Sequence, residues 1–430
     1  MKVLLIGGGG REAAIAASLK KSKHVDELYC APGNAGIAKI ATCVPIGVME
    51  FDKLIAFAKE KAIDLAVCSQ DDPLCAGIVD AFEAAGLKIF GTRKNAAIIE
   101  GSKAFSKQLM KKYGIPTAAY EIFTDADRAE EYLKKEVSFP IVLKASGLAL
   151  GKGVLICQNL QEALDGVKEI MLDRKFGAAG AELVIEEFMT GREVSALAFC
   201  DGKSYQLMSS SQDHKRIGDG DTGLNTGGMG TFSPSPFYTK EIDQICRETI
   251  YQKTIDAMAA EGRPFTGVLY FGLMLTKDGP KVVEYNTRFG DPETQVILPR
   301  LQNDLVDVML ACAEQRLDEV ELSWRDDWAV SVVLTSAGYP GSYEKGKVIT
   351  GIEDAEALDG VTVYHAGSRE QDGQILPNGG RVIDVTALGA TFEEARNLAY
   401  AACEKIDFEG KTLRHDIGLR ALKGRSAWDA

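Results

Sequence analysis

The sequence lacks any apolar run long enough to cross a bilayer. One of its longest runs, "GVLYFGLML" at residues 267–275, is much shorter than the ~20 residues that a membrane-spanning helix needs. The opening stretch, "MKVLLIGGGGRE", has neither the long apolar segment nor the small-residue cleavage site of a signal peptide. We therefore expect a cytoplasmic protein that has no membrane partner.

Paired cysteines are also absent. The nine cysteines are scattered singly, with no CxxC pair, and an odd total does not suit a disulfide framework or a zinc site. This pattern is typical of reduced thiols in a reducing compartment, where most single cysteines are small core residues.

The sequence has no excess of positive charge. Its 49 Lys and Arg residues face 62 Asp and Glu residues, for a net charge of −13. A nucleic-acid footprint needs clustered basic side chains, so we expect no nucleic-acid partner. Small phosphate ligands remain possible, because a few local lysines and backbone N–H groups suffice to bind them.

The sequence contains enough apolar residues to form several hydrophobic cores. It has 430 residues, of which 46% are hydrophobic and 26% charged, and this indicates two to four domains. Over residues 1–100, short apolar strands alternate with amphipathic helices, expected for instance at 51–61 and 72–86. Alternation of this kind predicts βαβ units and a doubly wound parallel sheet of the α/β class.

A glycine turn follows the first expected strand. Gly8, Gly10 and Ala13 fit the G-x-G-x-x-G/A pattern of dinucleotide sites. The second strand ends in "YCAPG", however, without the acid that would hold a ribose. Three interpretations stay open: a dinucleotide site, a tight turn that lets helix pack on sheet, and a phosphate ester at the helix N-terminus.

The pattern changes after residue 100. Strands and helices mix without strict alternation over residues 101–325, which predicts an α+β region. From about residue 326, short strands with Gly and Pro turns accompany one helix, "TFEEARNLAYAACEK". We expect a third, smaller domain there, and the chain contains no internal repeat.

A glycine-rich hairpin with lysines at its mouth is expected within "IVLKASGLALGKGVLIC". Lys144 closes one strand, and Gly147, Gly151, Lys152 and Gly153 precede the next. The spacing is not that of a Walker A loop, and the Ser or Thr is missing. Such a hairpin can still fold over a polyphosphate, because backbone N–H groups and lysines offset its charge.

Two further stretches carry polar groups. In "ELVIEEFMTGREVSALAF", Glu186, Glu187 and Glu193 flank a turn between two strands, where they could bind an adenine amino group and ribose hydroxyls. A long, irregular, glycine-rich stretch at 211–234 contains Asp213, His214, Lys215 and Arg216 in succession. Long loops in compact domains tend to be functional or disordered, and these four side chains favour function.

The stretch "EYNTRFGDPETQ" ends a hairpin that turns at Asp278 and Gly279. Strand alternation places Val282, Glu284 and Asn286 on one face. A carboxylate and an amide oxygen suit a hard cation such as Mg²⁺, which proteins hold with one or two oxygens plus the phosphates of a nucleotide. Arg288 follows, and can grip a carboxylate or a phosphate with two hydrogen bonds.

Taken together, these motifs resemble the ATP-grasp ligases and, more narrowly, the glycinamide ribonucleotide synthetase family. The stretches that resemble it run nearly from end to end: "GGGGRE", "APGNAGIA", "GLALGKGV", "QDHKR", "GLNTGGMG", "NTRFGDPETQ" and "HDIG". The resemblance implies an ATP-dependent ligase that joins glycine to 5-phosphoribosylamine through glycyl phosphate, in purine biosynthesis. It also implies a Rossmann-like domain at 1–100, an ATP-grasp region at 101–325 with a lid at 121–189, and a small mixed domain at 326–430.

The resemblance implies roles for individual residues as well. Contacts with ATP are expected from Lys103, Lys144, Gly151, Lys152, Gly153, Glu186, Glu187 and Glu193, of which Lys103 and Lys144 would contact phosphates, and Glu186 and Glu193 adenine and ribose. Glu284 and Asn286 would hold Mg²⁺ or Mn²⁺. Arg288 and Asp213 would act catalytically near glycine and the acyl phosphate. Substrates would bind at Gly9, Gly10, Arg11, Glu12 and Asp291, with the turn from Gly9 to Glu12 near the ribose phosphate of 5-phosphoribosylamine.

The chain departs from the family pattern at two positions. Ala13 stands where the family usually has histidine, and Ser146 where it usually has aspartate. Three rival hypotheses stay open: an ATP-grasp carboxylase with another acceptor, an NAD-dependent oxidoreductase that uses the first glycine turn, and, because of Ala13, a nucleotide-binding protein that has lost catalysis. We expect a monomer.

Overall fold

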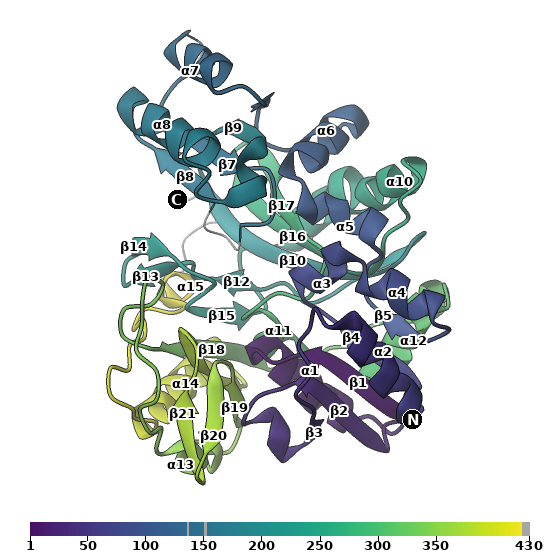
Figure 1. The fold of residues 1–430 in the computed structure, drawn as a ribbon. Coiled ribbons are helices and arrows are strands. Elements are labelled where there is room, and N and C mark those ends of the chain that lie inside the picture. Colours follow the sequence, from purple (N-terminus) through teal and green to yellow (C-terminus); the bar gives the residue numbers. More distant parts are fainter. Residues whose placement is uncertain (136, 150–152, 424–430) are drawn as a thin grey trace.

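The N-terminal domain is built on a parallel five-stranded sheet. The computed structural model describes residues 1–135, 137–149 and 153–423. The strands, in the order β3-β2-β1-β4-β5, are β1 (Lys2–Gly7), β2 (Glu27–Pro32), β3 (Thr42–Cys43), β4 (Leu65–Cys68) and β5 (Ile89–Phe90). The helices that cover them are α1 (Gly10–Lys20), α2 (Phe51–Glu60), α3 (Asp71–Ala76), α4 (Ile78–Ala84) and α5 (Lys94–Gly101), with a 3₁₀ turn at Ile37–Lys39. The predicted doubly wound α/β arrangement is confirmed (Figure 1).

One helix expected here is in fact two. The apolar pattern predicts a continuous helix over 72–86, but the chain breaks between α3 and α4 at Gly77, whose φ is +98°. Glycine adopts this left-handed conformation without the steric cost that a Cβ would add. The break is local, and periodicity alone does not report it.

The next unit is an antiparallel sheet that we call the lid sheet. Its strands, in the order β6-β9-β7-β8, are β6 (Tyr120–Phe123), β9 (Leu183–Glu187), β7 (Ile141–Ala145) and β8 (Val154–Cys157). It is preceded by α6 (Lys103–Tyr113) and carries α7 (Ala126–Lys135), α8 (Leu160–Val167), a π-helical turn at Lys168–Leu172 and a 3₁₀ turn at Gly177–Ala181. Figure 1 shows this unit at the top of the molecule.

A second antiparallel sheet, the central sheet, has the strand order β11-β10-β16-β17. Its strands are β10 (Arg192–Asp201), β11 (Tyr205–Leu207), β16 (Thr266–Thr276) and β17 (Gly279–Asn286). Its helical segments are α9 (Lys240–Cys246), a π-helical turn (Arg247–Tyr251), α10 (Gln252–Ala260), α11 (Thr294–Ile297), a 3₁₀ turn (Leu298–Arg300), α12 (Leu305–Ala313) and another 3₁₀ turn (Leu317–Glu319). The expected hairpin between β16 and β17 is present.

A β-bulge corrects one detail of β17. Gly272 pairs with Glu284, whereas the next residue, Leu273, pairs with Val282, so β17 contains one extra residue at this point. A bulge re-aims the side chains that follow it. Val282 therefore packs in the hydrophobic core with Tyr285, and the expectation that Val282 shares a face with Glu284 is wrong. Glu284 and Asn286 keep a common face.

The C-terminal sheet draws on two distant parts of the chain. Its order is β12-β15-β18-β22-β19, with β12 (Gln212–Asp213), β15 (Gly230–Ser233), β18 (Trp328–Thr335), β22 (Arg381–Gly389) and β19 (Val361–His365). The remaining elements are the hairpins β13 (Arg216–Gly218) with β14 (Thr222–Asn225) and β20 (Ser368–Gln371) with β21 (Gln374–Pro377), and the helices α13 (Ile352–Glu356), α14 (Phe392–Lys405) and α15 (Leu419–Leu422). The glycine-rich stretch that we expected to be irregular thus contains four short strands. Strands of two to four residues are too short to show an alternation.

Two expectations about composition can be compared with the fold. All nine cysteines are free, and seven of them are buried, as expected of small core residues. Among the residues that the structure describes, no helix combines the length and apolar character that a membrane span requires.

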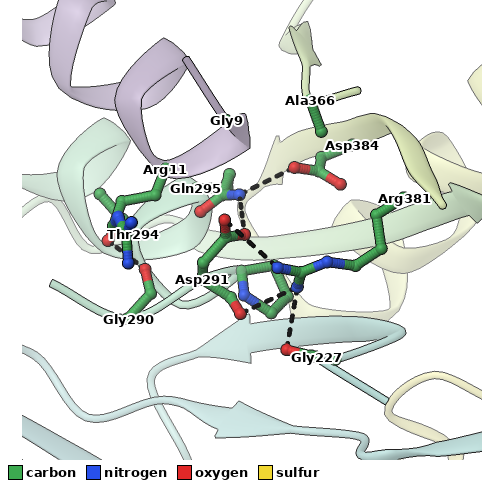
Figure 2. A network of polar contacts seen from close by, with 12 residues as sticks. Gly9, Arg11, Gly227, Gly290, Asp291, Thr294, Gln295, Ala366, Arg381 and Asp384 are labelled. Carbon is green, nitrogen blue, oxygen red and sulfur yellow. Dashed lines mark hydrogen bonds and ion pairs between the residues drawn. The ribbon is translucent and has the colours of Figure 1, made fainter. Parts of the chain in front are cut away.

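A polar network joins the central region to the C-terminal sheet and lies against the start of α1 in the N-terminal domain (Figure 2). Gln295 donates both hydrogens of its amide, one to Asp291 (2.9 Å) and one to Asp384 on β22 (2.8 Å). Arg381, also on β22, pairs with Asp291 (3.3 Å) and donates to the carbonyl of Gly227 (2.9 Å). Asp384 lies so close to α1 that a Cβ on Gly10 would stand 2.0 Å from its Oδ2.

The two carboxyl groups of this network titrate differently. Burial and the neighbouring Asp291 raise the pKa of Asp384 to about 7. Burial acts on Asp291 too, but the Arg381 guanidinium beside it holds the pKa of that carboxyl below its usual value. Asp384 is thus the member of the pair that keeps its proton toward neutral pH.

We expect the Asp384→Asn variant to gain stability relative to the wild type as the pH rises. The folded wild type binds a proton at Asp384 that the unfolded chain has lost above about pH 4, so folding stability falls between about pH 4 and pH 7. The variant lacks this penalty. Its free energy of unfolding, relative to wild type, should rise by on the order of 1–3 kcal/mol over this interval and then level off. Thermal unfolding midpoints at a series of pH values measure the difference.

Asp278→Asn provides the control, because Asp278 is exposed in the β16–β17 turn. Its difference from wild type should not depend on pH. A pH-independent difference for Asp384→Asn as well would mean that Asp384 is ionised in the folded protein throughout this range.

Candidate functional site

The residues expected to bind a nucleotide meet where the lid sheet faces the central sheet. Lys144 of β7 reaches across to the carbonyl of Val283 on β17 (3.4 Å). It also pairs with Glu186 of β9 (3.0 Å). A second lysine, Lys107 of α6, pairs with the same Glu186 oxygen (3.2 Å). The three side chains form a buried triad that the sequence analysis identified only in part.

Lys107 left one signal in the sequence. It follows Lys103 by four residues on α6, so the two lysines lie on the same helix face. Ser102 caps this helix by accepting a hydrogen bond from Phe105 N (3.1 Å), and Lys103 begins it. The Lys103 ammonium donates to the carbonyl of Gly147 in the glycine hairpin (3.2 Å). Burial lowers the pKa of Lys103, against the opposing effect of Glu284.

The glycine hairpin is described in part. Gly153 starts the return to β8, and its carbonyl accepts a hydrogen bond from Ala145 N (2.9 Å). Gly151 and Lys152, both expected to contact ATP, lie outside the described residues. Glu187 lies on the opposite face of β9 from Glu186, where it is exposed, pairs with Lys281 (3.6 Å) and accepts from Ala119 N (3.0 Å).

Glu284 and Asn286, the expected metal ligands, each face a cation of the protein itself, Lys215 for Glu284 and Arg288 for Asn286. The ammonium of Lys215 lies 3.6 Å from Glu284 and 3.4 Å from Glu193. Burial would raise the pKa of Glu284, but Lys215, Lys144 and Lys103 together hold it below its usual value. The amide oxygen of Asn286 accepts from Arg288 (3.5 Å). A carboxylate and an amide oxygen on one face, in a place that accommodates positive charge, fit a hard divalent ion.

Arg288 is held by two acids that the sequence analysis missed. It forms a short ion pair with Asp71 at the start of α3, and lies 3.7 Å from Glu100 of α5. Burial and Asp71 raise the pKa of Glu100 to about 7, and Glu100 accepts from both the backbone N and the hydroxyl of Thr287 (2.8 Å each). Asp71 is 217 residues away from Arg288 in sequence, and no local pattern marks the pairing.

Asp213 borders a small pocket of about 10 Å³, whose polar lining also includes Glu193, Ser195, Lys215 and Tyr270. A space of this size holds about one water molecule. Burial and the nearby Glu293 raise the pKa of Asp213 well above its usual value. Glu293 in turn accepts hydrogen bonds from Ser195 and Tyr270 (3.1 Å each). Asp213 is therefore protonated more readily than an exposed aspartate.

The loop that carries Asp213 and Lys215 is held by the "HDIG" segment near the C-terminus. Arg414 is buried and pairs with Asp221 and Asp416 (2.8 Å each). Asp416 accepts from Gly220 N (2.8 Å). His214 donates to the carbonyl of Gly230 and accepts from Gly418 N (3.0 Å each). Burial and Arg414 lower the pKa of His214 to about 4, so its imidazole is neutral at pH 7 and positions the loop.

The residues expected to bind the acceptor start α1. Glu12 accepts from Gly9 N (2.8 Å) and from the Arg11 side chain (2.8 Å), so it caps its own helix. Arg11 also donates to the carbonyl of Phe289 (3.3 Å), and Arg288 donates to the same carbonyl (3.2 Å). Two guanidinium groups from distant parts of the chain therefore lie side by side at the N-terminus of a helix. This is a favourable place for phosphate or carboxylate.

Comparison with known proteins identifies the family. Residues 1–100, 101–294 and 329–420 match the N domain, the ATP-grasp (A) domain and the C domain of phosphoribosylglycinamide synthetase. A phosphoribosylamine–glycine ligase from Brucella melitensis is 49% identical over 427 residues, which are 99% of this chain and 100% of that protein.

Solved structures agree with this assignment. The phosphoribosylamine–glycine ligase of Thermotoga maritima superposes with a TM-score of 0.84 at 36% identity, over 97% of this chain and 100% of that one. The biotin carboxylase domain of the 2-oxoglutarate carboxylase from Hydrogenobacter thermophilus superposes with a TM-score of 0.72 at 17% identity, over 96% and 91% of the two chains, which shows a shared fold. The expected resemblance is confirmed: this chain belongs to the phosphoribosylglycinamide synthetase family of ATP-grasp proteins.

Proposed function

We propose that this protein is an ATP-dependent ligase that joins glycine to 5-phosphoribosylamine, with release of ADP and phosphate, in purine biosynthesis. Membership of the family supports the activity, as do the name and full-length similarity of the Brucella relative. The observation that carries the proposal is the shared contact of Arg11 and Arg288 with the Phe289 carbonyl. This contact places Arg11, expected at the 5-phosphoribosylamine site, next to Arg288, expected at the glycine site.

ATP would bind between the lid sheet and the central sheet. Lys103 and Lys144 are assigned to its phosphates, Glu186 to adenine and Glu193 to ribose. The burial of Lys144 and Glu186 supports these roles, because buried charges are kept where a partner compensates them. Glu187 is also assigned to ATP, although its side chain lies on the opposite face of β9 from Glu186 and pairs with Lys281.

Glu284 and Asn286 are assigned to Mg²⁺ or Mn²⁺. The Lys215 ammonium, 3.6 Å from Glu284, supports this assignment because a cation is already compatible with the position. Such an ion, when bound, neutralises the charge of the nucleotide phosphates. The residues themselves would fix the direction from which the phosphates approach.

The reaction would proceed in two displacements. An oxygen of the glycine carboxylate attacks the γ-phosphorus of ATP, and the bond to the bridging oxygen breaks, giving glycyl phosphate and ADP. The amine of 5-phosphoribosylamine then attacks the acyl carbon, phosphate leaves, and the amine loses one proton. Arg288 would orient the glycine carboxylate, and Asp213, with its raised pKa, would lie where a proton has to be held.

We also propose that the protein is a cytoplasmic monomer that binds no nucleic acid. Nine free cysteines support a reducing compartment, and the net charge of −13 argues against a nucleic-acid partner. The domain limits at 100 and 325, with the lid at 121–189, are part of the proposal. They are supported by separate sheets, although β12 and β15 join the C-terminal sheet from within the central region.

Release of ADP should require ATP, glycine and freshly generated 5-phosphoribosylamine together. Leaving out any one of the three should reduce the rate to background, because glycyl phosphate forms only from bound glycine and turns over only when the amine attacks it. A coupled ADP assay measures the rate. Turnover with bicarbonate in place of glycine would favour a carboxylase, and dependence on a nicotinamide cofactor would favour an oxidoreductase.

Glu284→Ala should lower kcat for ADP release at least about 100-fold, since it removes a ligand expected to organise the phosphates in the transition state. Asp278→Ala is the matched control, because Asp278 is an exposed acid in the turn of the same hairpin. It should retain wild-type activity. If Glu284→Ala also kept wild-type activity over a titration of Mg²⁺, the metal assignment to β17 would be wrong.

A further inference from the structure

Among the described residues, the carboxylate of Glu186 makes contacts through only one of its two oxygens. Its Oε2 accepts from Lys107 (3.2 Å) and Lys144 (3.0 Å). Its Oε1 is buried and has no hydrogen-bond partner among the residues that the structure describes. A buried carboxylate oxygen without a donor is costly. A ligand group that donates a hydrogen bond to Oε1 would remove this cost.

The two lysines of the triad differ in what else they contact. Lys144 also reaches the Val283 carbonyl, one residue before Glu284, and is assigned above to the phosphates. Lys107 is almost fully buried, with 2% of its surface exposed. It donates to the hydroxyl of Thr117 (2.8 Å), which donates in turn to the Val282 carbonyl (2.7 Å). The position of Lys107 is thus fixed by protein groups alone.

This difference separates the roles of the two lysines once a nucleotide is bound. The ammonium of Lys144 would then donate hydrogen bonds to the phosphate oxygens, which are strong acceptors, and its pairing with Glu186 would weaken. Lys107 would then remain as the resident counter-ion of a buried carboxylate. Its pKa, lowered by burial to about 8, still leaves it mostly protonated at neutral pH.

We propose that Lys107 is a positioning residue for nucleotide selectivity: it holds Glu186 ionised and oriented, so that Oε1 accepts a hydrogen bond from the exocyclic amino group of adenine. The inference rests on the proposed function in one respect, that the nucleotide binds between the two sheets. It adds the residue that makes the site select its base.

The selection follows from donors and acceptors. An ionised carboxylate can only accept hydrogen bonds. Adenine presents an N–H donor at the position where guanine presents a carbonyl oxygen, so guanine would place two acceptors against each other in a buried site. Sites that read a polar group in this way discriminate strongly, because the wrong ligand leaves buried groups unpaired.

The test is a comparison of ADP and GDP binding to the full chain by calorimetry in the presence of Mg²⁺. The wild type should prefer ADP. Lys107→Met and Glu186→Gln should each lower the ratio of the two affinities at least about tenfold, mainly through weaker ADP binding. Because both variants disrupt one interaction, their double variant should be little worse than Glu186→Gln alone.

Lys112→Met is the matched control, a lysine of the same helix that pairs with Glu261 on the surface. It should leave the ratio unchanged. Thr117→Val keeps the shape of the side chain but removes the hydroxyl that holds Lys107, and it should shift the ratio in the same direction by a smaller factor. If Lys107→Met does not fold, Thr117→Val is the variant that tests the role of Lys107.

A wild-type ratio in folded Lys107→Met, or in Thr117→Val when the former does not fold, would overturn the inference. Its failure is distinct from failure of the proposed function. A shifted ratio in a chain that shows no ligase turnover would leave the inference standing without the ligase. Full ligase turnover with an unchanged ratio would support the ligase function and overturn the inference about Lys107.

Discussion

Compensation of buried charge is the constraint on which the site depends. Burial makes an unpaired charge far more costly than it is in water, so an acid in the interior either pairs with a cation or keeps its proton. Here the partners come from different domains: Arg288 of the central region pairs with Asp71 of the N-terminal domain, and Arg381 of the C-terminal sheet pairs with Asp291. Neutralising the charges therefore also fixes how the domains sit against one another.

The same constraint prepares the site for chemistry. Lysines and arginines that already face acids in fixed positions need little reorganisation when phosphates arrive, and preorganised charges of this kind are a large source of catalysis. Lys215 illustrates the exchange, because its ammonium lies between Glu193 and Glu284. Without a ligand, Lys215 balances the negative charge of both carboxylates. With a metal–nucleotide complex bound, the metal ion would balance the charge of Glu284.

Local patterns in the sequence predicted the parallel sheet, the β16–β17 hairpin and the common face of Glu284 and Asn286. They did not predict partners that are distant in the chain, such as Asp71 for Arg288 or Lys107 for Glu186, because such pairs leave no periodicity. The break at Gly77 and the bulge in β17 depend on single residues. β12 and β15 join the C-terminal sheet through pairing with distant strands, and strands of two to four residues are too short for a sequence pattern to predict this pairing.

Ala13 and Ser146, which depart from the family pattern, lie in different surroundings. Ala13 is buried in a hydrophobic cluster that joins the N-terminal domain to the central region, so alanine in place of histidine changes the packing of α1 in this cluster. Ser146 accepts a hydrogen bond from Ala104 N (3.1 Å) in the first turn of α6, a role that serine fills as aspartate would. What changes there is charge: a neutral hydroxyl stands where the family pattern has a carboxylate, one residue before the Gly147 carbonyl that accepts from the Lys103 ammonium.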